Sequence, residues 1–179
     1  MEVPCQYTYS MNNKENNFAF IDSQNLYLGV QELGWRLDNN RFRKYLFDKY
    51  DVRTAYLFIG YLPQNQSLYK SLQQAGYVLI FKSILIKKNK EPKGNVDADL
   101  VLQVMIDFKT YDKAVIVSSD GDFQSLVQYL DSCNKLKVVL SPNKQTCSVL
   151  LERAAKSKID YMNNLKKKLE YHNIMKKHR

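Results

Sequence analysis

Cysteine and long apolar runs are scarce in this sequence. Its three cysteines, Cys5, Cys133 and Cys147, are odd in number and show no CxxC spacing, so a disulfide framework and a cysteine-based zinc site are both disfavoured. This usage fits a reducing compartment, and we expect a cytoplasmic protein. The longest apolar runs, such as residues 77–81 and 114–117, have only the length of a strand, so we expect no membrane partner.

Several catalytic signatures are also missing. Both histidines, His172 and His178, lie near the C-terminus, which excludes a histidine general base within the core. The sequence contains no GxSxG, GxxxxGK[ST] or GxGxxG motif, so the nucleophile elbow, the phosphate-binding P-loop and the dinucleotide-binding fingerprint are absent. If this chain catalyses a reaction, the chemistry must therefore belong to carboxylates.

The net charge of +9 is concentrated in two segments. Residues 156–179 carry eight basic and two acidic side chains, and residues 87–93 carry four basic and one acidic. Such segments attract phosphates without regard to base sequence, although the charge alone is equally consistent with a solvated surface. The lysines that we expect to contact a nucleic acid are Lys87, Lys88, Lys90, Lys93, Lys166, Lys167 and Lys168.

Apolar periodicity divides the chain into alternating strands and helices. This order predicts an α/β fold in three layers, α/β/α, with a central, mainly parallel sheet of about five or six strands. We expect a flexible polar leader over residues 1–17, one domain over residues 18–162, and a basic C-terminal helix over residues 163–179. The expected strands are 18–22, 52–60, 77–81, 113–118, 137–140 and 159–162, with 84–86 as an extension or hairpin; the expected helices are 25–33, 40–49, 65–75, 96–108, 123–133, 149–155 and 163–178.

Acidic and amide residues follow two of the predicted strands at the edge where such sheets bind ligands. Asp22 and Asn25 follow the first strand, while Ser118, Ser119, Asp120 and Asp122 follow the fourth, and Asp97 begins the helix that precedes it. Carboxylates brought close together repel one another unless a cation neutralises them, and carboxylate oxygens suit Mg²⁺ or Mn²⁺. Such a metal can activate water and stabilise charge on a phosphodiester.

Each acid also has a structural interpretation. Asp22 is a plausible turn former, and Asp97, Asp120 and Asp122 suit helix N-caps. Their shared location at one rim of one sheet nevertheless favours a site. Asp107 and Asp112 lie at the opposite rim and are expected to be solvated surface acids.

Three segments resemble one family in the same order along the chain. Phe-Ile-Asp22-Ser-Gln-Asn25 resembles the opening D-x-x-N of the NYN domains, the LabA-like branch of the PIN-like nucleases. Lys93-Gly-Asn-Val-Asp97 resembles the K-G-V-D element of that family, with one extra residue. Ser118-Ser-Asp120-Gly-Asp122-Phe resembles its S-G-D-x-D-F signature. The resemblance covers about residues 18–162.

The resemblance implies a PIN-like fold and ribonuclease chemistry that depends on Mg²⁺ or Mn²⁺, with RNA as the partner. It implies Asp22, Asp97, Asp120 and Asp122 as metal ligands, with Asn25 orienting the first carboxylate or a metal-bound water. Ser118 and Ser119 are expected to support the site.

Two positions depart from the family pattern. Gln103 stands where members often carry another aspartate, and Ser119 replaces the glycine of S-G-D. Asp99 lies one turn before Gln103 on the same helix face and is the candidate to compensate as a further metal ligand. The apolar face of this helix is expected to comprise Leu100, Val101, Val104, Met105 and Phe108.

Two other functions compete with a ribonuclease. Gln103 favours a catalytically weak or inactive module that binds RNA and regulates. A phosphatase of the haloacid-dehalogenase type is disfavoured, because its D-x-D nucleophile motif would need an acid two residues after Asp22, where the chain has Gln24. The sequence leaves the oligomeric state open, a homo-oligomer included.

Overall fold

A computed structural model describes residues 15–82 and 96–172 of the chain. At its centre lies a six-stranded sheet in the order β3-β2-β1-β4-β5-β6, and every neighbouring pair of strands is parallel. The expected α/β/α fold with a parallel sheet is therefore confirmed. The strands are β1 (Asn17–Asp22), β2 (Val52–Gly60), β3 (Tyr77–Lys82), β4 (Ala114–Val117), β5 (Leu136–Ser141) and β6 (Ile159–Tyr161).

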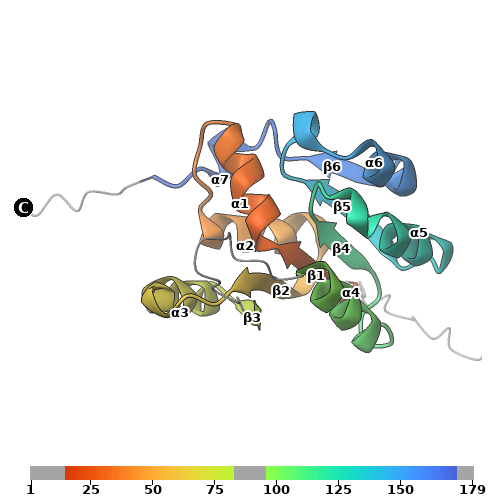
Figure 1. Ribbon diagram of the computed structural model, residues 1–179, viewed down its shortest axis with the longest axis horizontal. Helices are drawn as coiled ribbons and strands as arrows, with labels where there is room; N and C mark the ends of the chain where they lie inside the picture. Colours follow the sequence, from red (N-terminus) through yellow and green to blue (C-terminus); the bar gives the residue numbers. More distant parts are fainter. Residues whose placement is uncertain (1–14, 83–95, 173–179) are drawn as a thin grey trace, which may run out of the picture.

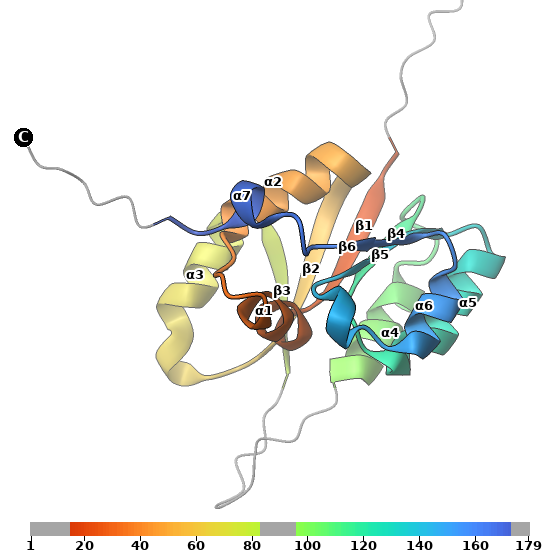
Figure 2. The same ribbon diagram turned by 90° about the horizontal axis from the view of Figure 1, so that it is seen from above.

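Helices cover both faces of the sheet (Figures 1 and 2). One face carries α1 (Ser23–Glu32), α2 (Asn39–Tyr50), α3 (Gln66–Gln74) and the short α7 (Lys166–Leu169), whose buried side chains join one core cluster. The other face carries α4 (Val96–Ile106), α5 (Gln124–Ser132) and α6 (Val149–Ala155), which form a second core cluster. The described residues also contain the 3-10 turns η1 (Pro63–Asn65), η2 (Gly121–Phe123) and η3 (Lys144–Thr146).

The central strand β1 shows why the sequence needs two helical layers. Successive side chains of a strand point to opposite faces of the sheet. Ala19 and Ile21 belong to the cluster under α1 and α2, whereas Phe20 belongs to the cluster under α4 and α5. All three are fully buried, so β1 is apolar on both faces, as a central parallel strand must be.

The chain leaves β1 and β4 toward opposite faces of the sheet. From β1 it enters α1 on one face, and from β4 it enters α5 on the other. The adjacent carboxyl ends of these two strands therefore form the switch point at which open α/β sheets bind ligands. Among the described residues, no helix combines the length and apolarity needed to cross a membrane.

The structure corrects the expected start of the domain. Residues 1–14 lie outside the described part, but Glu15, Asn16 and Asn17 are built into the fold. Asn17 is fully buried as the first residue of β1. Its side chain donates to the Tyr50 carbonyl at 2.8 Å and accepts from the Lys113 amide at 3.1 Å. The flexible leader therefore does not extend to residue 17.

The expected C-terminal helix over residues 163–178 is also wrong within the described residues. Helix α7 covers only Lys166–Leu169, and Glu170 has extended backbone angles. Glu170 forms an antiparallel bridge with Leu37, while the buried Leu169 packs in the core cluster with α2. Docking onto the start of α2 therefore ends the helix after one turn.

Candidate functional site

Asp22 joins strand β1 to helix α1. As the N-cap of α1, its Oδ1 accepts a hydrogen bond from the Asn25 amide at 3.1 Å. Its side chain is buried, and burial raises its pKa to about 6; the Asn25 bond opposes this rise, and the charges of Asp97 and Asp120 add to it. The ionised carboxylate of Asp22 is therefore costly to hold without a nearby cation.

Asp120 and Asp122 lie in the turn after β4. Asp120 caps η2, and its Oδ1 accepts from the Asp122 amide at 3.0 Å. The Asp120 amide donates to Ser118 Oγ at 3.1 Å. These local bonds hold both acids at the carboxyl end of β4, where Gly121 separates them in the sequence.

This turn is held from two sides by its neighbours. The Oδ1 atom of Asn25 accepts from the Ser119 amide at 2.7 Å, and the Ser148 amide donates to the Ser119 carbonyl at 2.9 Å. The Ser119 hydroxyl meets Ser141 Oγ at 2.8 Å in a buried contact on β5. Asn25 thus fixes the turn that carries Asp120, and Ser119 is accommodated by a hydroxyl partner on the next strand.

Gly121 is required by close packing. A Cβ atom at this position would overlap Ser148 Oγ at the start of α6. A larger residue would therefore require the Ser148 hydroxyl to rotate away or the turn to shift, since the Ser148 amide is bonded to the Ser119 carbonyl.

Asp97 completes a cluster of carboxylates from the first turn of α4. Asp97, Asp120 and Asp122 each offer an oxygen, and these three atoms lie within 4.8 Å of one another. Burial raises the pKa of Asp97, and Asp120 and Asp122 raise it further, while Lys82 lowers it. Across the described ranges, 15–82 and 96–172, no ion pair neutralises any of these acids or Asp22.

The donor set fits a hard divalent cation. Metal–oxygen bonds of about 2.0–2.6 Å place two ligands of the same ion no more than about 5 Å apart, and the three oxygens already satisfy this limit. The set contains only carboxylates, the ligand type that suits Mg²⁺ and Mn²⁺. Asp97, Asp120 and Asp122 are thus the residues that could hold such an ion, with Asp22 beside them.

Lys82 is a functional candidate that the sequence analysis missed. It is the last residue of β3 and is buried, and its Nζ has no hydrogen-bond partner among the described residues. Burial lowers the pKa of Lys82, and the charges of Asp97, Asp99 and Asp22 act in the opposite direction. A charged residue at an inward position of an otherwise apolar strand was the available signal.

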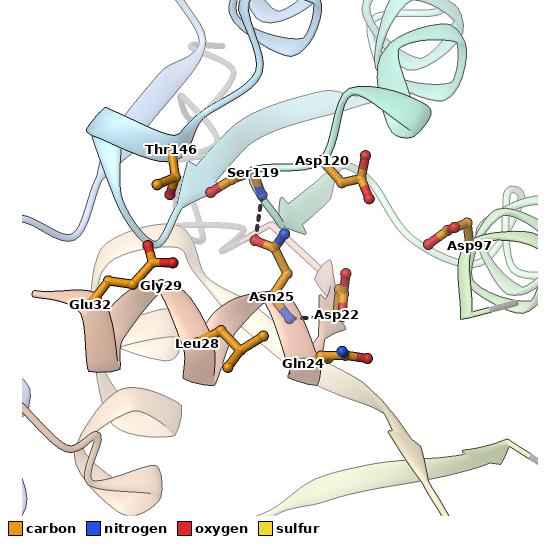
Figure 3. A pocket seen from close by; sticks show the side chains of 10 residues that line it. All are labelled: Asp22, Gln24, Asn25, Leu28, Gly29, Glu32, Asp97, Ser119, Asp120 and Thr146. Atoms are coloured by element: carbon orange, nitrogen blue, oxygen red, sulfur yellow. Dashed lines mark hydrogen bonds between the residues drawn. The ribbon is translucent and has the colours of Figure 1, made fainter. Parts of the chain in front are cut away.

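A cavity of about 360 Å³ lies between α1 and the turns after β4 and β5 (Figure 3). Asp22, Asp97 and Asp120 line one end, Glu32 and Thr146 the other, with Asn25 and Ser119 between them. Of the α1 residues on this wall, Asn25 was predicted from the sequence, whereas Gln24, Leu28, Gly29 and Glu32 were not. Their spacing was the available signal, since Gln24, Leu28 and Glu32 recur every four residues on one helix face.

Several expected site residues lie elsewhere. Asp99 is exposed and belongs neither to the carboxylate cluster nor to the cavity lining. Gln103 Nε2 donates to Asp107 Oδ2 at 2.8 Å, so its side chain points along α4 toward the helix end. The expected roles of Asp99 as a metal ligand and of Gln103 as a supporting residue are therefore not supported by this geometry.

The basic residues also lie apart from the cavity. Lys87, Lys88, Lys90, Lys93 and the expected strand 84–86 fall outside the described residues. Lys166 pairs with Glu170 at 3.8 Å, and the Lys168 ammonium lies 5.0 Å from the centre of the Tyr45 ring. Neither these two nor Lys167 lines the cavity.

Comparisons with known proteins identify the family and the fold of the chain. The family model described as "NYN domain" matches residues 18–162. The chain is 29% identical over 122 residues to "Low amplitude and bright protein LabA" of Synechococcus elongatus, a match that spans 62% of this chain and 65% of that protein. The chain thus covers less than two thirds of the length of this relative.

A solved structure shares the fold. The crystal structure of a Vibrio parahaemolyticus protein of unknown function superposes with a TM-score of 0.72 and covers 86% of this chain and 96% of the other. The two sequences are 22% identical. This likeness concerns the arrangement of the strands and helices alone.

Proposed function

The chain belongs to the NYN domain family of the PIN-like nuclease superfamily, and from its site we propose that it is a divalent-metal-dependent ribonuclease. RNA is the proposed substrate, Mg²⁺ or Mn²⁺ the proposed cofactor, and the cytoplasm the proposed setting. The observation that carries the proposal is the cluster of Asp97, Asp120 and Asp122, whose oxygens converge within 4.8 Å without a paired cation among the described residues.

The proposed roles follow from the position of each side chain. Asp97, Asp120 and Asp122 would hold the ion, which when bound supplies an activated water and stabilises charge on the phosphodiester. Asp22 lies buried beside them, and a bound cation would offset the cost of ionising its carboxylate. Asn25 acts as a positioning residue, because its Oδ1 holds the Ser119 amide at the base of the Asp120 turn.

A second candidate is an RNA-binding module with little or no hydrolysis. The observation that favours it is the placement of Asp99 and Gln103, which add no ligand to the carboxylate cluster. Three carboxylates can hold an ion, but a cluster of three has less negative charge than a cluster of four or more and would bind the ion more weakly. The two candidates differ in turnover, not in the fold or the substrate.

A metal titration of RNA cleavage tests the proposal. The variant Asp120→Asn should lose at least about 100-fold in Mn²⁺-dependent cleavage, because one ligand and its charge are removed from the ion. Asp48→Asn provides the matched control. Asp48 lies on α2, away from the carboxylate cluster, and pairs with Lys44 at 2.9 Å, so the control should cleave within about twofold of the wild type.

Circular dichroism of both variants would confirm that they fold. Equal cleavage by Asp120→Asn and the wild type would overturn the assigned site. Metal-dependent binding of RNA by the wild type, with no cleavage at any Mn²⁺ or Mg²⁺ concentration, would instead support the second candidate.

A further inference from the structure

The cavity extends beyond the carboxylates along one face of α1. Asp22 stands at its start and Glu32 ten residues later, which corresponds to about 15 Å of helix axis. Helical side chains lean toward the N-terminus of their helix, so the Glu32 carboxylate leans back along the cavity toward the acids (Figure 3). The far end is therefore within reach of a group attached to a phosphate at the cluster.

The size of this space suits part of a single strand. A volume of about 360 Å³ lies at the lower end of the range for small-ligand pockets. It can admit one nucleotide that has left a base stack, but not a paired and stacked duplex. Proteins that read RNA sequence commonly bind such unstacked bases by their faces and Watson–Crick edges.

The far end of the cavity is chemically different from the cluster. Glu32 Oε2 accepts from Asn143 Nδ2 at 3.2 Å, and Asn143 is itself buried and accepts from the Gln145 amide at 3.0 Å. The Glu32 carboxylate is thus oriented by a fixed amide, and no ion pair among the described residues neutralises it. A carboxylate here repels phosphate and accepts N–H donors.

Leu28 lies between the two ends and supplies an apolar surface. Its side chain is 51% exposed although the residue lies on the wall of the cavity. Across the cavity floor, α1 approaches the turn after β5 closely, because Gly29 lies against the Pro142 side chain and has no Cβ of its own. The ring face of a base could lie on Leu28 while its edge faces Glu32.

We propose that this part of the cavity is a base subsite for guanine in single-stranded RNA, adjacent to the scissile phosphate, with Leu28 under the ring and Glu32 on the Watson–Crick edge. The inference rests on the proposed ribonuclease function and names its preferred substrate. Guanine places two adjacent donors, N1–H and N2–H, on that edge and can bond both oxygens of one carboxylate. Adenine and cytosine offer one amino donor beside an acceptor, and uracil offers one N–H between two carbonyls.

Sequencing the new ends made in a random single-stranded RNA pool tests the subsite. The wild type should show guanine enriched about tenfold at one position beside the cut, in line with a bidentate base contact. Glu32→Gln should lose this enrichment. Gln31→Ala, which changes the neighbouring exposed residue on α1 outside this cavity, should retain it. Replacing guanosine by inosine, which lacks the N2 amino group, in the RNA should reproduce part of the loss of enrichment.

A wild type that cuts without base preference, or a Glu32→Gln variant that retains the preference, would overturn the inference. A calorimetric titration with guanosine and uridine monophosphates in Mn²⁺ separates this failure from a failure of the proposed function. Tighter binding of the guanosine nucleotide, lost in Glu32→Gln, would support the subsite even if the wild type cleaved no RNA. Equal binding of the two nucleotides would overturn it.

Discussion

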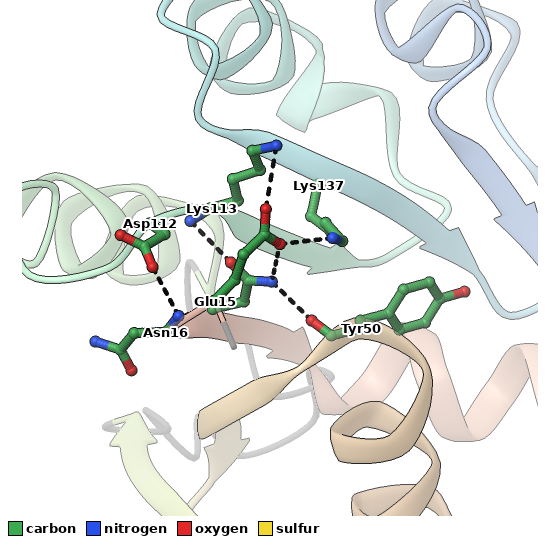
Figure 4. Close-up of polar contacts among 7 residues, drawn as sticks. Glu15, Asn16, Tyr50, Asp112, Lys113 and Lys137 are labelled. Atoms are coloured by element: carbon green, nitrogen blue, oxygen red, sulfur yellow. Dashed lines mark hydrogen bonds and ion pairs between the residues drawn. The ribbon is translucent and has the colours of Figure 1, made fainter. Parts of the chain in front are cut away.

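The two rims of the sheet hold acidic residues in opposite ways. At the amino rim, near the start of β1, Glu15 lies between two lysines, with Oε2 2.6 Å from Lys137 Nζ and Oε1 3.4 Å from Lys113 Nζ (Figure 4). At the carboxyl rim, Asp97, Asp120 and Asp122 converge on one another instead. Among the described residues, the same class of side chain thus forms ion pairs at one edge and is gathered without an ion pair at the other.

The pKa values express this difference. A hydrogen bond from Asn17 and the neighbouring Lys137 and Lys113 lower the pKa of Glu15 to about 2. Burial, with the charges of Asp97 and Asp120, raises the pKa of Asp22 to about 6. The fold therefore stabilises the charge of Glu15 and disfavours the charge of Asp22. Paired acids of the first kind contribute to stability, whereas unpaired, converging acids of the second kind indicate a site for a cation.

Removing the charge of Asp22 should produce the larger effect on stability. Without metal at pH 8, Asp22→Asn should raise the free energy of unfolding by about 3 kcal/mol, since the pKa of Asp22 is raised from 3.8 to about 6 and one pKa unit corresponds to about 1.4 kcal/mol. Asparagine also caps helices well, so the N-cap of α1 is kept. The pKa of Asp22 is higher in the folded than in the unfolded state. The stability that Asp22→Asn gains over the wild type should therefore grow between about pH 4 and 6 and stay constant above pH 6.

Asp38→Asn is the matched control for this comparison. Asp38 caps α2 through the Asn40 and Arg41 amides, both at 3.0 Å, and lies outside the carboxylate cluster. Urea denaturation in EDTA should show no gain for this variant. A gain equal to that of Asp22→Asn would mean that the charges at the carboxyl rim do not repel one another.

Removing the charge of Glu15 should have a smaller effect of opposite sign. Glu15→Gln should lower the free energy of unfolding by about 1 kcal/mol at pH 7, because its pairs with Lys113 and Lys137 are partly screened by solvent. The pKa of Glu15 is lower in the folded state, so its contribution is complete above about pH 4.5 and is lost as the pH falls toward 2.

The wild type should accordingly lose more stability than Glu15→Gln between pH 5 and 3. Thermal denaturation followed by circular dichroism at several pH values measures this difference. Parallel curves for the two proteins would show that the pairs at the amino rim contribute nothing, and the contrast between the rims would then rest on Asp22 alone.

The sequence predicts most elements of this fold because apolar periodicity and turn residues mark their ends. Strand β2 and helix α6 occupy the expected residues, Val52–Gly60 and Val149–Ala155. Errors arise where tertiary contacts override local pattern. Asn17 is polar yet fully buried, because the Tyr50 carbonyl at the end of α2 and the Lys113 amide just before β4 bind its side chain. Glu170 leaves the helical conformation to pair with Leu37.

In the candidate site too, the prediction succeeded where the local sequence pattern decides and failed where tertiary contacts decide. Acids that follow strands were found from sequence because the carboxyl ends of parallel strands share one rim. The face of α4 was less predictable, since apolar residues occur on most sides of this helix. Met105, expected in the core, is 40% exposed, and Gln103 turns to Asp107. Glu32 and Leu28 were missed because their spacing marks a shared face of α1 but does not show which part of the fold that face meets.

Anomalous diffraction from a crystal soaked in Mn²⁺ tests the central claim most directly. The ion should give a peak between the carboxylates of Asp97, Asp120 and Asp122, next to Asp22, and Asp120→Asn should abolish or weaken it. Amino-rim acids such as Glu15, which already bind lysines, should give none. A fully soaked crystal with no peak at the carboxyl rim, or with the same peak in Asp120→Asn, would contradict the assignment of this cluster as a metal site.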